Sequence, residues 1–342
     1  MKLKKALFCL LSMLLLVMVL TFTVFANEGK RNYDNIELCL GGMPFGAKII
    51  SNGLTVVKFS STQGKDISSA YQAGIRQGDV IIKINGNNIN TIEDFVKQVN
   101  SSEGKAMNVT VLRNSKELCF SVTPRYSSDD GKYKTGVWVK DSTTGIGTVT
   151  YIDPNTHCFG GLGHAICDSS TGKAIPLTRG VVMNVTINGV IKGQVGAAGE
   201  LKGCFQATRM GKLARNTECG VFGVLMPDSY KSPENLVKIC PKEDVKEGEA
   251  YIWCTLDETG PQKYKVQISN IDLSGGKTKN FRVTVTDPSL LEKAGGIVQG
   301  MSGSPIIQDG RLIGAVTHVL INDPTTGYGI FIENMLDASE IA

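Results

Sequence analysis

The sequence has 342 residues, with 36 Lys plus Arg against 32 Asp plus Glu, so the formal net charge is only +4. This balance excludes the basic footprint that nucleic-acid binding needs, and we expect no nucleic-acid partner. Hydrophobic residues make up 42% of the chain, which excludes wholesale disorder. The 39 glycines indicate many turns and therefore predict a mainly β protein.

The N-terminus carries the pattern of an export signal. Three of the first five residues are lysines, and residues 6–26 then carry no charge. This run is longer than the usual core of a secretory signal and close to the roughly 20 residues that span a bilayer. Val24 and Ala26 fit the −3 and −1 positions of a cleavage site. The pattern predicts a signal peptide or a signal anchor over residues 1–26, with the body of the protein outside the cytoplasm.

A polar linker, residues 27–35, precedes a first folded module that we place at residues 36–126. Thr91 and Asp94 have the spacing of a capping box at the start of a helix whose apolar residues share one face. The elements predicted in this module are a strand at 54–59, a turn, strand and turn over 73–86, a helix at 91–99 and a hairpin of strands at 108–112 and 118–122.

The middle of this module carries a glycine-rich signature ahead of the helix and the two last strands: Ala73-Gly74-Ile75, Gly78-Asp79-Val80-Ile81 and Ile84-Asn85-Gly86. In this order the signature resembles that of a PDZ domain. The resemblance implies that a peptide is added as an extra strand and that a loop of backbone N–H groups captures its terminal carboxylate. The candidate loop is Gly42, Met43, Pro44, Phe45 and Gly46. The alternative is a module that packs on its neighbour and binds no free peptide.

Residues 127–134 are polar and predict a second linker, after which residues 135–342 form a second module. Short strand patterns between Gly, Asn, Asp and Ser turns run through it, for example at 181–189, 264–268 and 281–285. Many short strands at regular spacing favour a sandwich or a barrel. One helix is predicted near the end, at 333–341.

The strongest local signal for chemistry is G-M-S-G-S-P at residues 300–305. A serine between glycines, with proline three residues later, is typical of the nucleophile turn of chymotrypsin-like peptidases. Glycine permits the backbone conformations that aim N–H groups inward. Ser302 is therefore the predicted nucleophile, and the N–H groups of Gly300 and Ser302 are the predicted oxyanion hole. The alternative is an ordinary turn of small residues.

A serine nucleophile needs a base, and the chain has three histidines. His164, in the stretch G-L-G-H-A-I, precedes the serine as in the chymotrypsin-like order and is the predicted base. His318 lies in an apolar strand pattern and is predicted to be a core or supporting residue, while His157 follows a turn. An aspartate must orient the imidazole. Spacing leaves several candidates open, Asp168 and Asp287 among them.

The N-terminal segment, the PDZ signature and the two motifs together resemble the SpoIVB (stage IV sporulation protein B) serine peptidase family of endospore-forming bacteria. The resemblance covers the chain from Leu40 onward. It implies a chymotrypsin-like double-barrel peptidase domain behind a small α+β PDZ domain. It also implies a triad of Ser302, His164 and Asp287, with the aspartate 15 residues before the serine. No metal and no cofactor is expected.

The same resemblance implies a role in signalling. Family members are exported into the space between the two forespore membranes, where they cleave themselves and a membrane-bound regulator that restrains the processing of a late sigma factor. The expected partners are this regulator, the chain itself and a peptide ligand of the PDZ domain. The alternative function is a PDZ adaptor whose β domain is catalytically silent. The joint presence of His164, Ser302 and Gly300 favours the enzyme.

Overall fold

The structure is a computed structural model that describes residues 33, 36–61, 67–114, 116–168, 172–230 and 236–339. Contacts divide the chain after residue 36, and the larger unit is Glu37–Ala342. The expected signal peptide or anchor over residues 1–26 lies outside the described residues. Within the described part, no helix is long and apolar enough to cross a membrane.

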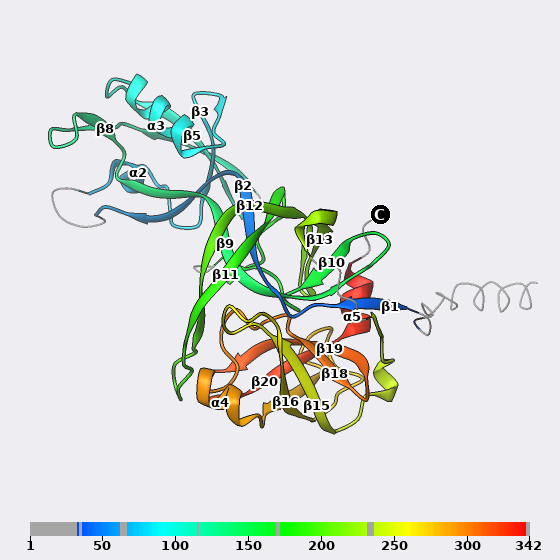
Figure 1. Cartoon of the computed structure of the whole chain (residues 1–342). Helices are drawn as coiled ribbons and strands as arrows, with labels where there is room; N and C mark the ends of the chain where they lie inside the picture. Colours follow the sequence, from blue (N-terminus) through cyan, green and yellow to red (C-terminus); the bar gives the residue numbers. More distant parts are fainter. Residues whose placement is uncertain are drawn as a thin grey trace, which may run out of the picture. The chain divides into compact units, whose positions relative to one another are not determined.

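A first barrel is formed by strands that pair in a ring, and the ring is closed where β9 pairs with β2 (Figure 1). Its core includes Phe45, Phe159 and Val182, none more than 1% exposed. Two short strands, β1 (Glu37–Leu40) and β14 (Leu236–Lys238), extend the sheet beside β9. The ring runs through β9 (Val137–Ile152), β10 (Cys158–Gly161), β13 (Gly220–Leu225), β12 (Glu200–Thr217), β11 (Arg179–Ile191) and β2 (Pro44–Phe59).

A second, closed barrel follows in the chain and is drawn from yellow to red in Figure 1. In β16, Tyr264, Val266 and Ile268 are buried while the residues between them are exposed, the period-two pattern of a strand with one face on a core. The predicted strands at 264–268 and 281–285 are confirmed. Two helices accompany this barrel, α4 (Pro288–Ala294) and α5 (Ile332–Ala338). The barrel strands are β15 (Gly248–Cys254), β16 (Gln262–Ser269), β17 (Phe281–Val285), β20 (Asp323–Phe331), β19 (Arg311–Leu320) and β18 (Pro305–Gln308).

The PDZ module has its own core, which includes Leu54, Ile81 and Met107. The capping box at its main helix is confirmed, because Asp94 N donates to Thr91 Oγ1 at 3.1 Å and Thr91 N donates to Asp94 Oδ2 at 3.1 Å. Besides the second half of β2, the module contains α2 (Ser69–Gln72), β3 (Val80–Ile84), β4 (Asn87–Asn88), α3 (Ile92–Ser101), β5 (Met107–Arg113) and β6 (Lys116–Val122).

The Gly78-Asp79 part of the PDZ signature has a structural reason. The Asp79 side chain is 1% exposed and accepts two hydrogen bonds from the Arg113 guanidinium, both at 2.7 Å. It also accepts a hydrogen bond from Arg76 N at 2.8 Å. This buried carboxylate therefore ties the turn before β3 to the end of β5.

The pairing divides the chain differently from the expected module boundaries. Residues 44–50 of β2 pair with β9 and β11 in the first barrel, while residues 54–59 of the same strand belong to the PDZ module. Residues 125–134, expected largely as linker, form the hairpin of β7 (Arg125–Ser127) and β8 (Lys132–Lys134).

The expected peptide-binding loop, Gly42, Met43, Pro44, Phe45 and Gly46, lies in the first barrel, which contradicts its placement in a PDZ groove. Phe45 is fully buried, and its backbone pairs with Gly147 of β9. Its ring packs edge-on against the ring of Phe159, with the centroids 5.4 Å apart. The apolar sequence of this segment fills a barrel core, so its backbone is not available to a peptide.

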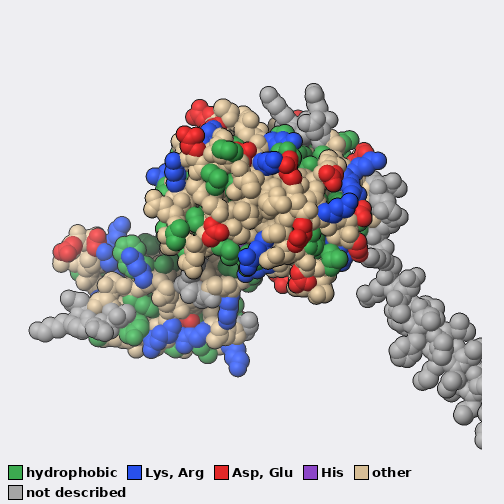
Figure 2. Space-filling view, turned by 90° about the horizontal axis from the view of Figure 1, so that it is seen from below, with side chains coloured by type: hydrophobic (Ala, Val, Ile, Leu, Met, Phe, Trp, Pro, Cys, Tyr) green, Lys and Arg blue, Asp and Glu red, His purple; other side chains and the backbone are tan. Residues whose placement is uncertain are grey.

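Exposed charged side chains contribute little to the stability of this fold. On the face shown in Figure 2, basic and acidic side chains are interspersed over the surface. Exposed ion pairs such as Lys293–Asp257 and Arg311–Asp244, both at 3.0 Å, contribute about 0–1 kcal/mol each. The two barrels and the PDZ module therefore depend on their apolar interiors for stability.

Candidate active site

The nucleophile turn lies between α4 and β18 and is held by the first barrel. Thr148 N in β9 donates to Ser302 O at 2.9 Å, and Thr148 Oγ1 donates to Gly300 O at 2.8 Å. Thr150 Oγ1 donates to Gly303 O at 2.7 Å. Gly303 has a φ of +94°, and an added Cβ would collide with the Thr148 carbonyl. The glycine motif thus permits a close approach between the two barrels.

The two serines of the motif have different environments. The Ser304 side chain is fully buried, and its hydroxyl donates to Met301 O at 2.6 Å inside the turn. Ser302 is half-buried, and its hydroxyl donates to Thr317 O at 2.6 Å. Ser304 is therefore a structural residue of the turn, and Ser302 is the serine that a substrate can reach.

The backbone donors of the turn fall into two groups. Met301 N donates to Val298 O at 3.1 Å, and Gly303 N donates to Val316 O at 2.7 Å. Among the described residues, the N–H groups of Gly300 and Ser302 donate to no protein acceptor. Two uncommitted N–H groups two residues apart are what an oxyanion hole requires.

His164 follows β10 of the first barrel through a turn in the left-handed region, with Leu162 at a φ of 65° and Gly163 at 66°. A non-glycine residue in this region stores strain and is frequent at functional sites. His164 Nδ1 lies 2.9 Å from Ala165 O, which favours the tautomer that carries the proton on Nδ1 and leaves Nε2 as the acceptor. Burial lowers the pKa of His164, so the ring is neutral and suited to act as a base at neutral pH.

His318 lies beside this centre, where the sequence analysis expected a core or supporting residue. The His164 and His318 ring centroids are 4.9 Å apart, and the planes are tilted by 37°. His318 directly follows Thr317, whose carbonyl accepts the Ser302 hydroxyl. Ser302 is thus linked to His164 through Thr317 and His318, while among the described residues no hydrogen bond joins the Ser302 hydroxyl to the His164 ring. Sequence gave no sign of this, because β19 has only an ordinary apolar strand pattern.

The two candidate aspartates are engaged elsewhere. Asp287 is the N-cap of α4, where it accepts hydrogen bonds from Ser289 N at 2.9 Å and Leu290 N at 3.2 Å. Its other oxygen accepts from Lys265 N at 3.2 Å. Asp168 forms an ion pair with Lys140 at 3.1 Å. The described structure gives neither aspartate a contact with His164, whose Nδ1 bonds a backbone carbonyl instead.

His157, the third histidine, supports a turn. Its Nδ1 lies 2.7 Å from the Tyr230 hydroxyl, and its backbone N donates to Asp153 O at 2.9 Å. Within the described residues, no group of three or more His, Cys, Asp or Glu side chains could hold a metal ion.

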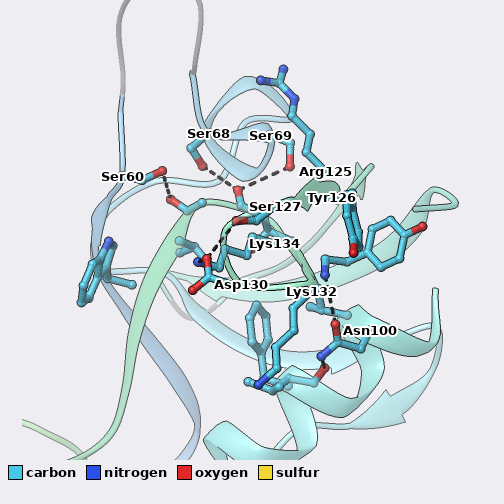
Figure 3. A pocket seen from close by; sticks show the side chains of 18 of the residues that line it. Ser60, Ser68, Ser69, Asn100, Arg125, Tyr126, Ser127, Asp130, Lys132 and Lys134 are labelled. Atoms are coloured by element: carbon cyan, nitrogen blue, oxygen red, sulfur yellow. Dashed lines mark hydrogen bonds and ion pairs between the residues drawn. The ribbon is translucent and has the colours of Figure 1, made fainter. Parts of the chain in front are cut away.

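A groove of about 950 Å³ in the PDZ module is a second candidate site (Figure 3). One wall is α3, where Ile92 and Val96 are 38% and 42% exposed, and the opposite wall is the start of β9. The predicted apolar face of the helix is thus divided, because its other half, Phe95 and Val99, is buried in the core. Trp138, 57% exposed, also lines the groove.

The turn at the start of β9 is anchored by serines, as Figure 3 shows. Ser68 Oγ donates to Thr135 O at 2.8 Å, and Ser60 Oγ donates to Gly136 O at 3.2 Å. From this turn, residues 137–140 pair with β2 along one edge, and in the described structure no strand pairs with their other edge. A free strand edge opposite a helix is the geometry of peptide addition. The sequence signal for it was Gly136 before the β-branched and aromatic residues Val137-Trp138-Val139.

The fold and the site define a class. Two antiparallel barrels, with a histidine from the first and a serine turn from the second, form the architecture of a chymotrypsin-like serine peptidase, here joined to a PDZ module. The family model described as SpoIVB peptidase S55 matches residues 131–336, and a PDZ-domain model matches residues 43–123. The chain belongs to the SpoIVB peptidase S55 family and is a serine peptidase.

Similar curated proteins match only part of the chain. The regulator of sigma-W protease RasP from Bacillus subtilis is 38% identical over 71 residues, which are 21% of this chain and 17% of that protein. A probable periplasmic serine endoprotease DegP-like from Bartonella henselae is 32% identical over 107 residues, and the match covers 25% of this chain and 21% of that protein. The chain thus spans about a fifth of the length of these relatives.

Solved structures give distant similarities. The active form of the Rv3671c protease from M. tuberculosis is 15% identical, with 58% of this chain and 75% of that chain covered and a TM-score of 0.34. The PDZ domain of an SdrC-like protein from Listeria monocytogenes is 19% identical. The match covers 27% of this chain and 93% of that chain, with a TM-score of 0.23.

Proposed function

We propose that this serine peptidase is an exported signalling endopeptidase of sporulation that cleaves itself and a membrane-bound regulator, which leads to processing of a late sigma factor. The family assignment and the export pattern of residues 1–26 support this role. The catalytic part is supported by the uncommitted N–H groups of Gly300 and Ser302 at the nucleophile turn. It is also supported by the His164 ring, which lies beside His318, the residue that follows the acceptor of the Ser302 hydroxyl. The compartment proposed is the space between the two forespore membranes.

The proposed chemistry starts from the neutral His164 ring. Its Nε2 takes the proton of the Ser302 hydroxyl, which leaves its bond to Thr317 O, and the serine oxygen attacks the scissile carbonyl. The N–H groups of Gly300 and Ser302 then stabilise the oxyanion. His164 returns the proton to the leaving amine, and water hydrolyses the acyl-enzyme. Asp287 is the third triad member that the family resemblance implies, although in the structure one of its oxygens caps α4 and the other accepts from Lys265 N.

The PDZ groove is the proposed recognition site. An extended segment of the regulator, or of a second copy of this chain, adds as a strand to the free edge of residues 137–140. Its apolar side chains pack on Val96 and Trp138, which are exposed in the absence of a peptide. Recognition at this groove and cleavage at Ser302 are then separate steps.

Self-cleavage of the full chain tests this function. The parent protein is expected to give discrete fragments over time, and the Ser302→Ala variant none. Ser274→Ala, which changes an exposed serine, serves as the matched control and should cleave like the parent. Equal fragments from the parent and from Ser302→Ala, or no fragments from the parent, would contradict the proposal.

A catalytically silent PDZ adaptor is the second candidate function. It would use the groove but leave Ser302 inert. The uncommitted N–H groups of Gly300 and Ser302 disfavour it, because a silent domain has no use for unpaired donors.

A further inference from the structure

His318 has a feature that a structural histidine does not need. Its Nδ1 is buried and has no hydrogen-bond partner among the described residues. A buried polar atom without a partner costs about 1–3 kcal/mol, so such atoms in native proteins call for an explanation. A phenylalanine or leucine would fill the same space without this cost. The imidazole at this position therefore points to a use for its nitrogen.

The neighbour that could use this nitrogen is His164. With ring centroids 4.9 Å apart, a nitrogen of one ring can come within hydrogen-bond reach of the other after a small rotation. Among the described residues, the resting His164 ring has one hydrogen-bond partner, the Ala165 carbonyl. When His164 takes the serine proton it becomes an imidazolium with N–H groups on both nitrogens, and a neutral acceptor nearby then stabilises its charge.

We propose that His318 is a positioning residue of the catalytic centre, whose ring restrains the His164 imidazole and whose unpaired nitrogen stabilises the imidazolium form of His164. This inference rests on the proposed catalytic role of His164. The proton moves from Ser302 Oγ to His164 Nε2, and the Nδ1–H of His164 is shared between Ala165 O and His318. The proton on Nε2 then passes to the leaving amine, and both rings return to the neutral form.

Burial, more than the neighbouring basic groups, keeps His318 in the neutral form that this role needs. Burial, then the neighbouring His164 and Lys279 lower the pKa of His318 to about 4. Lys279 comes from the segment before β17, and its ammonium lies 5.4 Å from the Tyr328 ring of β20. No carboxylate contributes to the pKa of His318, so the ring remains an acceptor at neutral pH.

A histidine titration by NMR tests the proposal without any need for activity. The full chain carrying Ser302→Ala, with histidine-selective ¹³C labels, is compared with the same chain carrying His318→Phe or His318→Asn. His318→Phe keeps a ring without nitrogen, and His318→Asn keeps an acceptor oxygen close to the position of Nδ1. We expect His318→Phe to lower the pKa of His164 by about one unit, a tenfold change, and His318→Asn to leave it near the parent value. The His157 signal is the internal control.

An unchanged or raised pKa of His164 in His318→Phe would overturn the proposal, since a purely structural ring predicts that result. In the active chain, the rate at which a fluorophosphonate labels Ser302 should fall about tenfold in His318→Phe and recover in His318→Asn. If the parent is not labelled, the proposed function fails, while the NMR titration still decides the role of His318.

Discussion

Thr148 joins the two barrels at the nucleophile: its N–H donates to the Ser302 carbonyl and its hydroxyl donates to the Gly300 carbonyl. Both bonds come from one residue of β9, whose side chain is 1% exposed. The backbone of the turn is therefore fixed from the other barrel. This explains how the N–H groups of Gly300 and Ser302 can stay uncommitted without the turn collapsing onto them.

Thr148→Val should weaken catalysis while keeping the fold. The variant has nearly the same shape but loses the hydroxyl bond to Gly300 O, at a cost of about 1 kcal/mol in the free energy of unfolding. We expect fluorophosphonate labelling to slow about tenfold, less than the roughly 10²–10³ for loss of an oxyanion donor. Thr144→Val, at an exposed position of the same strand, is the control and should label like the parent. Equal rates for both variants would contradict this role of Thr148.

Substitutions at Asp287 separate a helix cap from a triad member. Asp287→Ala removes the cap of α4 and should lower the free energy of unfolding by about 1 kcal/mol. Asp287→Asn keeps an acceptor for Ser289 N and should retain stability. If capping is its role, Asp287→Asn also keeps the labelling rate of Ser302. A loss of about 10⁴-fold in Asp287→Asn would instead assign the carboxylate to His164 and contradict the capping role.

The stability of the protein should fall on mild acidification. The pKa of His318 is about 4 in the folded protein against 6.5 unfolded, and burial lowers that of His164 as well. Between pH 4 and pH 6.5 the unfolded state binds more protons at these histidines than the folded state does. The stability that comes from keeping the two rings neutral is therefore complete above pH 6.5 and is lost as the pH falls towards 4. Urea unfolding of the Ser302→Ala chain across this window measures it. His318→Phe should reduce the slope of the free energy of unfolding against pH. A free energy of unfolding that rises as the pH falls would contradict the lowered pKa of these histidines.

The PDZ groove should govern cleavage of other protein chains and leave the chemistry at Ser302 unchanged. Val96→Glu places a charge on the exposed apolar wall of α3. We expect it to slow cleavage of an added Ser302→Ala chain about tenfold, or about 1.4 kcal/mol, with no change in fluorophosphonate labelling. Val57→Glu, of similar exposure and outside the groove, is the control. Equal effects of the two variants would mean that the groove does not hold the substrate chain.

Local patterns predicted the local structures well. The capping box of Thr91 and Asp94, the hairpin of β5 and β6 and two strands of the second barrel, β16 and β17, follow from period and turn residues alone. These elements depend on a few neighbouring residues and are therefore readable from sequence. The glycine motif around Ser302 also predicted a turn, but the steric demand at Gly303 is long-range, since an added Cβ would collide with the Thr148 carbonyl.

Long-range partners could not be predicted in the same way. The segment Gly42–Gly46 has the glycines of a binding loop, yet a barrel closed by β2 and β9 buries Phe45 in its core. His318 faces His164 because β19 passes the nucleophile turn, a contact between residues 154 positions apart. No local pattern encodes such a contact. The same holds for Thr148, whose partners are Gly300 and Ser302.

The most direct test of the catalytic centre is the labelling of the full chain with a fluorophosphonate, followed by mapping of the modified residue. We predict a single modified serine, Ser302, and no labelling in Ser302→Ala or His164→Phe, because the hydroxyl needs the neutral imidazole to lose its proton. Ser304 should remain unmodified, since its buried hydroxyl is bonded to Met301 O. Labelling that persists in His164→Phe, or that maps to another serine, would contradict the account of this site.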